Sequence, residues 1–544
     1  MYISQLDLIK AKLRAVQSYS ISAVIKDLIS THEKDPAVII MKTAVDYYAD
    51  NHDILKKDFT RSVIYHSEEE NGNQIDSDTR DETEVVINPN NSNHHNVHNY
   101  FRQLVDQEAD YIAGDPPAVV VEGAGSDPDK KSLLKTFEDE ITKITSDELF
   151  AKLIADTIVE ARTKGCAYWH PYIDSKGALR YIVLPAEEVI AVYDTAYQTE
   201  IREFLRYYKI AVMRNNNVRH VNRVEWWTAD DVTYFIEDDS GEYSIEQFPD
   251  GQSNPAPHWQ ETMILDASGD ATVTARSWGR VPLIEIVGDK TRSSLLRRIK
   301  GLQDAYNLLS SKLTNDEIDL VALFWVIQGY GGESASKIRK KLEMNKGVSL
   351  DDPDGKIDAK QVDLNTSERI QFLDSIKKDI FSLGEGLIPD MERSGNINTV
   401  ELKMRYAKLN MKAKRMVREI KVGLKSLFEF IVEDMNNNNG TGYDSALIKA
   451  EFHFDQITSD TDTIDNILKL RGLVPDTILM SLIPYVDDPN QAWIELQAQK
   501  KAEAEVKANA YNVPRATSTA AVDGKVTQAA NSVEANSVDQ KLNK

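Results

Sequence analysis

Cysteine, export signals and long apolar runs are nearly missing from this chain of 544 residues. The single cysteine, Cys166, cannot form an intrachain disulfide, which fits a reducing cytoplasm, and its simplest role is a free buried thiol. Residues 6–28 do not resemble a signal peptide, because Lys, Arg, Asp and Gln interrupt them repeatedly. No apolar run reaches the roughly 20 residues that span a bilayer. We expect a soluble protein, assembled in the cytoplasm, without membrane contact.

Positive charge is also scarce. Lys and Arg number 64 against 87 Asp and Glu, which gives a net charge of −23. A protein that reads DNA sequence normally has a basic surface, so this balance argues against that class. The hydrophobic fraction of 41% is enough for sizeable cores and excludes general disorder. The length exceeds what one core supports and predicts several domains or one subunit of many segments.

Motifs for catalysis and cofactor binding are missing as well. The chain has no Gly-x-x-x-x-Gly-Lys-Ser/Thr loop, and Gly123-Ala-Gly125 leads into Asp127-Pro rather than a third glycine and a helix. His94 and His98 have metal-ligand spacing on a predicted helix but no further ligand, so solvated histidines at a helix start are more plausible. We expect no enzyme, no catalytic residue, no cofactor and no metal, although spacing alone does not exclude a triad.

The most informative stretch is residues 281–329. A short strand comes first, and then apolar residues recur at steps of three and four, which predicts a helix with Ser293 or Ser294 as N-cap. The apolar positions are Leu295, Ile299, Leu302, Tyr306, Leu309 and Leu313. The opposite face should meet water or a partner, and it carries Arg297, Lys300, Asp304, Asn307 and Ser311. An acidic patch follows at Asp316, Glu317 and Asp319, which is either a solvated surface or a charge repeated around a ring axis.

Two more helices are predicted at residues 366–383 and 399–435, separated by a segment rich in Gly, Pro and Asn at 384–398. The longer one would span on the order of 50 Å, which suggests an elongated subunit. It is basic, and its cations either form surface salt bridges or face acids of a neighbouring subunit. They are Lys403, Arg405, Lys408, Lys412, Lys414, Arg415, Arg418, Lys421 and Lys425.

The remaining chain predicts an α+β protein. Helices are expected at 6–16, 22–31, 35–49, 94–112 and 133–163, and a loop or hairpin tip at 67–84. Strands are expected at 84–87, 168–173, 179–184, 189–193, 204–212, 220–227 and 233–237. A short basic helix is expected at 334–344, and an Asn-rich linker or turn follows the long helix at 436–440. A strand at 451–454 and helices at 459–470, 475–482 and 491–510 complete the pattern, and the tail from residue 514 should be disordered.

Three stretches carry a resemblance to a known family. After Gly288-Asp289-Lys290, residues 302–307 read Leu-Gln-Asp-Ala-Tyr-Asn, and residues 99–106 read Asn-Tyr-Phe-Arg-Gln-Leu-Val-Asp. Residues 467–477 read Ile-Leu-Lys-Leu-Arg-Gly-Leu-Val-Pro-Asp-Thr. In their order along the chain, 99–106, 302–307 and 467–477, these stretches resemble the portal proteins of tailed bacteriophages, of the type found in long-tailed siphophages. The resemblance covers about residues 99–493 and is most specific at 302–317 and 379–406.

The resemblance implies an α+β fold with an elongated portal subunit: an α/β wing, a two-helix stem, a small α/β clip, a long wing helix and an α-helical crown. The implied segments are wing 1–290, stem helix 291–320, clip 321–361, second stem helix 362–386, tunnel loop 387–398, long wing helix and connection 399–450, crown 451–512 and disordered tail 513–544. The tunnel loop would include Leu387, Ile388, Pro389, Asp390, Met391, Glu392, Arg393, Ser394, Gly395 and Asn396. The junction into the long helix, Asn398-Thr-Val-Glu-Leu, departs from the Ser-Gly-x-Ala pattern common in the family, which leaves the loop boundaries open.

The implied function is a ring of twelve subunits at one capsid vertex, which nucleates head assembly and conducts double-stranded DNA during packaging and ejection without sequence specificity. Its implied partners are other copies of itself, the terminase large subunit, the major capsid and scaffolding proteins and a head-completion or adaptor protein. The acidic patch residues Asp316, Glu317 and Asp319 would face the channel, where an acidic wall lets DNA slide. Two alternatives stay open: another virion structural or head-tail connector protein, and, less favoured, a nucleic-acid-processing enzyme.

Overall fold

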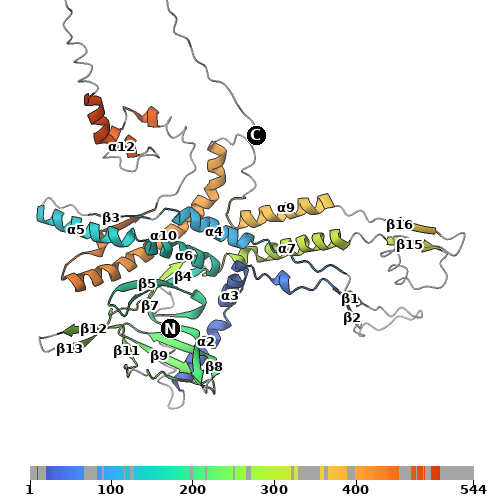
Figure 1. The fold of residues 1–544 in the computed structure, drawn as a ribbon, viewed down its shortest axis with the longest axis horizontal. Coiled ribbons are helices and arrows are strands. Elements are labelled where there is room, and N and C mark those ends of the chain that lie inside the picture. The colour runs from blue at the N-terminus through green and yellow to red at the C-terminus, as the bar shows by residue number, and fades with distance from the viewer. Residues whose placement is uncertain are drawn as a thin grey trace, which may run out of the picture. The chain divides into compact units, whose positions relative to one another are not determined.

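The computed structural model describes part of the chain, and all statements below concern that part: residues 9, 20–65, 83–87, 91–115, 117–122, 128–194, 200–214, 217–248, 251–264, 271–319, 324–328, 356–360, 366–388, 399–452, 467–472, 474–481, 483 and 492–502. The chain divides into two compact units, Met1–Gln456 and Ile457–Lys544. Helices and strands are mixed in the first unit, so the predicted α+β class is confirmed (Figure 1).

The largest sheet has the strand order β10-β9-β8-β7-β6, with β11 paired to β9. Its strands are β6 (Val189–Tyr193), β7 (Ile201–Arg214), β8 (Asn217–Trp227), β9 (Asp231–Glu237), β10 (Tyr243–Ile245) and β11 (Ala256–Pro257). All neighbours run antiparallel, and alternating residues such as Phe204, Val224 and Phe235 are fully buried. Both faces of this sheet are covered, because Phe204 lies in one buried cluster with Trp227, and Val224 and Phe235 lie in another with Leu205.

A second, three-stranded sheet connects the strand region to the helices. Its order is β14-β4-β5, from β4 (Cys166–Ile173), β5 (Leu179–Leu184) and β14 (Ile284–Val287). Smaller antiparallel pairs are β1 (Arg61–Tyr65) with β2 (Thr83–Ile87), β12 (Trp259–Ile264) with β13 (Ala271–Arg276), and β3 (Ala118–Val121) with β17 (Ile448–Glu451). Cys166 is a free buried thiol, as expected, and burial raises its pKa to about 12.

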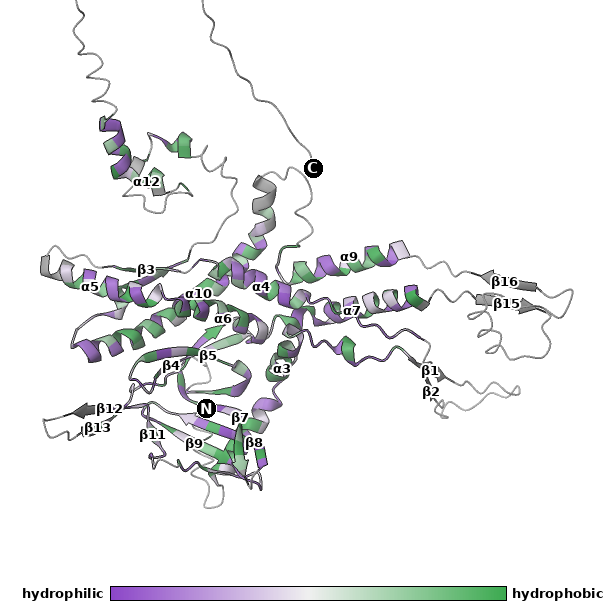
Figure 2. Cartoon of the chain, viewed as in Figure 1, coloured by the Kyte–Doolittle hydropathy of each residue, from purple (hydrophilic) through white to green (hydrophobic). Residues whose placement is uncertain are grey.

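Helices pack against this second sheet around the largest core. They are α4 (Tyr100–Ala113), α5 (Pro128–Thr145), α6 (Glu148–Lys164) and the 41-residue α10 (Thr399–Asn439). Trp169 and Ile286 of the sheet meet Ile158 of α6 and Ile420 of α10 in one cluster of buried side chains. Gly423 lets α10 approach the sheet, because a Cβ at this position would collide with Ile286. The hydrophobic residues of these helices are coloured green in Figure 2, and those in this cluster are buried.

The central segment follows in the order α7 (Leu296–Asp319), β15 (Phe324–Gln328), β16 (Lys356–Lys360), α9 (Thr366–Leu383) and α10. The strands β15 and β16 pair antiparallel. At the N-terminus, α2 (Ile21–Glu33) and α3 (Pro36–Tyr48) begin at the caps Ser20 and Asp35. Short 3-10 turns lie at Asp53–Lys56, Ala186–Glu188 and Ser445–Leu447. In the second unit, α12 spans Asp476–Ser481, and residues 467–470 and 492–502 are helical.

Several predicted boundaries were wrong. The helix expected at 94–112 begins only at Tyr100, so His94 and His98 do not lie on a helix. The helix expected at 133–163 is two helices, because α5 ends at Thr145 and Asp147 caps the start of α6. The Asn-rich stretch expected as a linker continues α10 to Asn439, and Gly440, with φ 64°, ends it. The strand expected at 451–454 lies earlier, at Ile448–Glu451.

Other predictions lie outside the described residues. These are most of the first helix at 6–16, most of the segments 67–84 and 321–361 including the helix at 334–344, residues 389–398, much of the predicted crown and the C-terminal tail.

Candidate functional site at the helix pair and the loop base

The helices α7 and α9 form an antiparallel pair (Figure 1). Leu296 and Ile299 near the start of α7 share a buried cluster with Ile376 and Ile380 in the second half of α9. At the other end, Asp316 Oδ2 lies 2.5 Å from Arg369 Nη1, and the Thr366 hydroxyl donates to Glu317 Oε1 at 3.0 Å. The end of α7 therefore adjoins the beginning of α9, as the connection through β15 and β16 requires.

Two of the three predicted acidic residues are bound to α9 in this way. The side chains of Asp316 and of its partner Arg369 are exposed to a similar, intermediate degree. Glu317 is exposed. Asp319 is the last residue of α7, and its side chain lies outside the described part. The structure brings Asp316 and Glu317 together at the end of the helix pair. Whether they line a channel stays a prediction.

The polar face of α7 is exposed only in part, which corrects the prediction that the whole face meets water or a partner. Asn307 and Ser311 are fully buried beneath residues 94–98, a segment we call the strap. Strap amides donate to α7 side chains: His94 N to Asn315 Oδ1 at 2.8 Å, Asn96 N to Ser311 Oγ at 2.9 Å and His98 N to Asn307 Oδ1 at 3.0 Å. These bonds satisfy the strap backbone without a helix.

The described start of the predicted tunnel loop is held by α4. The amide of Leu387 donates to Gln107 Oε1 at 2.7 Å, and Gln107 Nε2 donates to the Leu387 carbonyl at 3.2 Å. Gly384 and Gly386 pack so closely on Leu104 that a Cβ at either position would overlap its methyl groups. Of the ten predicted loop residues, only Leu387 and Ile388 are described, and Pro389, Asp390, Met391, Glu392, Arg393, Ser394, Gly395 and Asn396 are not.

A buried charge cluster lies behind this loop base. The Glu108 side chain is fully buried, and its carboxylate lies 2.6 Å from Arg162 Nη2 of α6 and 2.7 Å from Lys412 Nζ of α10. Burial alone would raise the pKa of Glu108, but the nearby Lys412 and Arg162 outweigh it and lower that pKa below its ordinary value. Glu108 is therefore ionised, and it joins three helices through one carboxylate.

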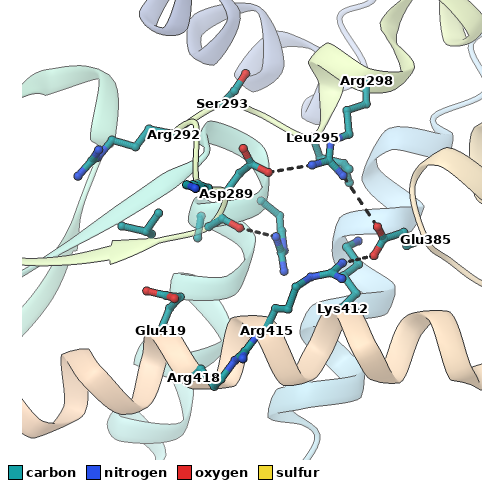
Figure 3. Close-up of a pocket in the computed structure, with 15 residues that line it drawn as sticks. Asp289, Arg292, Ser293, Leu295, Arg298, Glu385, Lys412, Arg415, Arg418 and Glu419 are labelled. Carbon is teal, nitrogen blue, oxygen red and sulfur yellow. Dashed lines mark hydrogen bonds and ion pairs between the residues drawn. The ribbon is translucent and has the colours of Figure 1, made fainter.

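A cavity of about 660 Å³ opens beside this cluster (Figure 3). Glu385, on the segment after α9, bridges it: its carboxylate pairs with Arg415 of α10 and lies 4.0 Å from Arg298 of α7. Arg298 also pairs with Asp289 at 2.8 Å. The backbone of Glu385 is left-handed, with φ 57°, a conformation that costs a non-glycine residue on the order of 1 kcal/mol or more.

Sequence reasoning missed Glu108, Gln107 and Glu385 as site residues. For Glu108 a signal existed, because it falls four residues after Leu104 on the apolar stripe of its helix, where a charge needs a buried partner. Lys412 falls similarly between the buried residues Leu409 and Ala413. Gln107 and Glu385 gave no such signal, since their partners lie on elements far away in the sequence.

The described part of the chain contains neither a candidate metal site nor a helix that could cross a membrane. Among the described residues, no group of three or more His, Cys, Asp or Glu side chains could hold a metal ion. No described helix combines the length and apolar character needed to cross a bilayer.

Comparison with known proteins shows which family the chain is similar to. A family model described as "Phage portal protein, SPP1 Gp6-like" matches residues 29–506. The chain is 25% identical to the portal protein of Bacillus phage SPP1 over 492 residues, which cover 90% of this chain and 88% of that protein. It is 24% identical to the portal protein of Clostridium phage phiCD119 over 486 residues, which cover 86% of this chain and 94% of that protein. The chain belongs to the SPP1 Gp6-like family of phage portal proteins.

Proposed function

We propose that this phage portal protein forms a ring, of twelve subunits on the family pattern, whose axis conducts double-stranded DNA at one capsid vertex. Portal proteins are virion components that associate with copies of themselves and with the capsid. The finer partners belong to the proposal: the terminase large subunit during packaging, scaffolding and major capsid proteins during assembly, and a head-completion or adaptor protein afterwards. The protein itself would be a structural platform, assembled in the host cytoplasm, with the motor supplying the hydrolysis.

The observation that carries the proposal is the order of elements from α7 to α10. An antiparallel helix pair whose far end carries the β15–β16 pair, followed by a constrained turn and a 41-residue helix, supports a stem, a clip, a tunnel loop and a long wing helix. On this proposal the wing comprises residues 1–290, and the crown comprises residues 451–512. The subunit would be elongated along the channel.

The acidic end of the helix pair fits a conduit. Glu317 is exposed and Asp316 is half-exposed, so in a ring each charge would be repeated by every subunit. DNA carries one phosphate charge per ~1.7 Å of helix axis, so acidic side chains along the wall would keep the polymer from binding tightly. A basic side chain at the same place should slow its passage.

Packaging by a portal-deficient phage that is complemented with variants of this chain tests the proposal. Glu317→Lys should leave particle assembly intact but reduce the DNA packaged per particle, because it adds a ring of cations to the channel wall. The matched control is Asp139→Lys, the same charge change at an exposed position of α5. Equal packaging by both variants and by the wild type would refute an acidic channel wall at Glu317.

A further inference from the structure

We propose that the cavity between α6, α7, α10 and the segment 384–386 is a binding site for phosphate groups, with Glu385 as an internal competitor for the same cations. The inference goes beyond the proposed function, because it concerns one chain and requires no ring.

The wall of the cavity is positively charged in a strongly acidic protein. Seven cationic side chains line it against three carboxylates, Asp289, Glu385 and Glu419. Two more carboxylates lie behind the wall, where Glu108 holds Arg162 and Lys412 and Glu285 holds Arg292. Counting all five carboxylates still leaves an excess of two positive charges, in a chain whose net charge is −23.

Two of the cations have no carboxylate of their own. Lys290, in the turn after β14, and Arg418, on the exposed side of α10, line the cavity and form no ion pair with any residue that the structure describes. Arg298 and Arg415 point toward the same space, between the start of α7 and α10, and both face the carboxylate of Glu385, while Arg298 also pairs with Asp289 (Figure 3). A bound anion would give Lys290 and Arg418 a counter-charge and would compete with Glu385 for Arg415 and Arg298.

The chemistry of the wall favours phosphate over a single carboxylate. Guanidinium groups from two helices line the cavity, Arg298 from α7 and Arg415 and Arg418 from α10, and their planar forks match phosphate oxygens. The volume of about 660 Å³ is that of a small-ligand pocket and exceeds what one carboxylate side chain fills. An excess of two charges matches a phosphate dianion, or two successive phosphodiesters of a nucleic acid.

Glu385 connects such binding to the loop base. Its left-handed backbone is held between Gly384 and Gly386, which pack on Leu104, and by the pair with Arg415. A phosphate that takes Arg415 and Arg298 removes the ionic restraint on Glu385. Occupancy should therefore loosen residues 384–388, where the predicted tunnel loop begins.

Isothermal titration of the full chain at low salt, with inorganic pyrophosphate as the probe, tests the site. Arg415→Gln and Arg418→Gln should each weaken binding about tenfold, the loss expected for one charge-assisted hydrogen bond. Glu385→Gln should tighten binding several-fold, because the competing charge is removed; misfolding would not produce that result. The matched control is Lys414→Gln, an exposed cation of α10 that does not line the cavity, and it should bind like the wild type.

A second arm identifies the source of the phosphate. If a random-sequence DNA duplex displaces pyrophosphate from the wild type, the natural ligand is a nucleic-acid backbone; if it does not, the ligand is a free phosphate compound, and both results support the site. Absence of pyrophosphate binding, equal weakening by Lys414→Gln, or weaker binding by Glu385→Gln would overturn it. Pocket variants that bind normally but no longer self-associate would assign the cavity to a subunit interface instead. Electron microscopy of the same samples separates failure of this site from failure of ring formation.

Discussion

Glu108 is a charged residue in the interior that holds two cations from different helices. Its replacement by Gln leaves Arg162 and Lys412 buried without a counter-charge, and loss of one partner of a buried ion pair costs ~3–5 kcal/mol. We expect urea denaturation to show a loss of that order. The matched control is Glu122→Gln, whose partner Lys449 is exposed, and it should change stability by less than about 1 kcal/mol. Similar losses for both variants would contradict the role of Glu108.

His170 makes the fold sensitive to acid. Its Nδ1 donates to the Pro282 carbonyl at 2.7 Å, and burial lowers its pKa to about 4, below the unfolded value of ~6.5. As the pH is lowered from about 6.5 to about 4, His170 becomes protonated in the unfolded chain but stays neutral in the folded chain. Stability should therefore decrease by about 3 kcal/mol from this residue alone.

Unfolding measured by urea from pH 7 to pH 4 tests this prediction. In His170→Asn the side-chain amide replaces Nδ1 as the donor to Pro282. The slope of the unfolding free energy against pH should therefore fall by the contribution of about one proton. The exposed His220→Asn is the control and should keep the wild-type slope. An unchanged slope in His170→Asn would show that His170 protonates freely in the folded state.

At the residue scale, the sequence predicted which residues are buried better than it predicted which residues contact one another. The burial of Cys166 and the apolar positions of α7 followed from residue type and periodicity. The pairing of Glu385 with Arg415 joins separate elements, and no local pattern specifies that contact.

The strap on α7 is the clearest feature at the scale of elements. The buried Asn307 accepts the His98 amide through Oδ1, and its Nδ2 donates to Nδ1 of the buried His52 at 2.9 Å. Asn307→Ala leaves these groups without partners, which should cost ~1–3 kcal/mol and speed amide exchange at residues 94–98. Lys312→Ala, at an exposed position of the same helix, is the control. Wild-type exchange of the strap in Asn307→Ala would contradict this account.

Gln107 fixes the base of the predicted tunnel loop by two hydrogen bonds to Leu387. Gln107→Ala removes both bonds, and the Leu387 amide should exchange with solvent faster. Gln107→Glu keeps the acceptor for that amide and loses only the donor to the carbonyl, so its exchange should stay near the wild-type rate. Hydrogen exchange resolved to residues 384–388 distinguishes them. If Gln107→Ala and the wild type exchange alike, the loop base is held by other contacts.

Element types were predictable where one periodicity was sustained. The strands from β4 to β9 and the helices α3, α7, α9 and α10 appear with close to their expected bounds. The helix expected from His94 failed because side chains of α7 offered the strap amides better partners than a helix would. The expected linker after α10 failed because asparagines can extend a packed helix until a glycine ends it.

At the scale of the whole molecule, membership in the portal family and the order of elements point to one assembly. A chain with a net charge of −23 and a stem-like helix pair suits a wall past which DNA moves better than a surface that grips it. A closed ring requires two different surfaces that fit each other on successive subunits. Family membership establishes the portal class, and the number of subunits remains a proposal.

Electron microscopy of the purified full-length protein at high concentration tests this claim most directly. The account predicts closed rings with a central hole, with twelve subunits in two-dimensional averages. A species that stays strictly monomeric at every concentration, or one that assembles without a central opening, would contradict it.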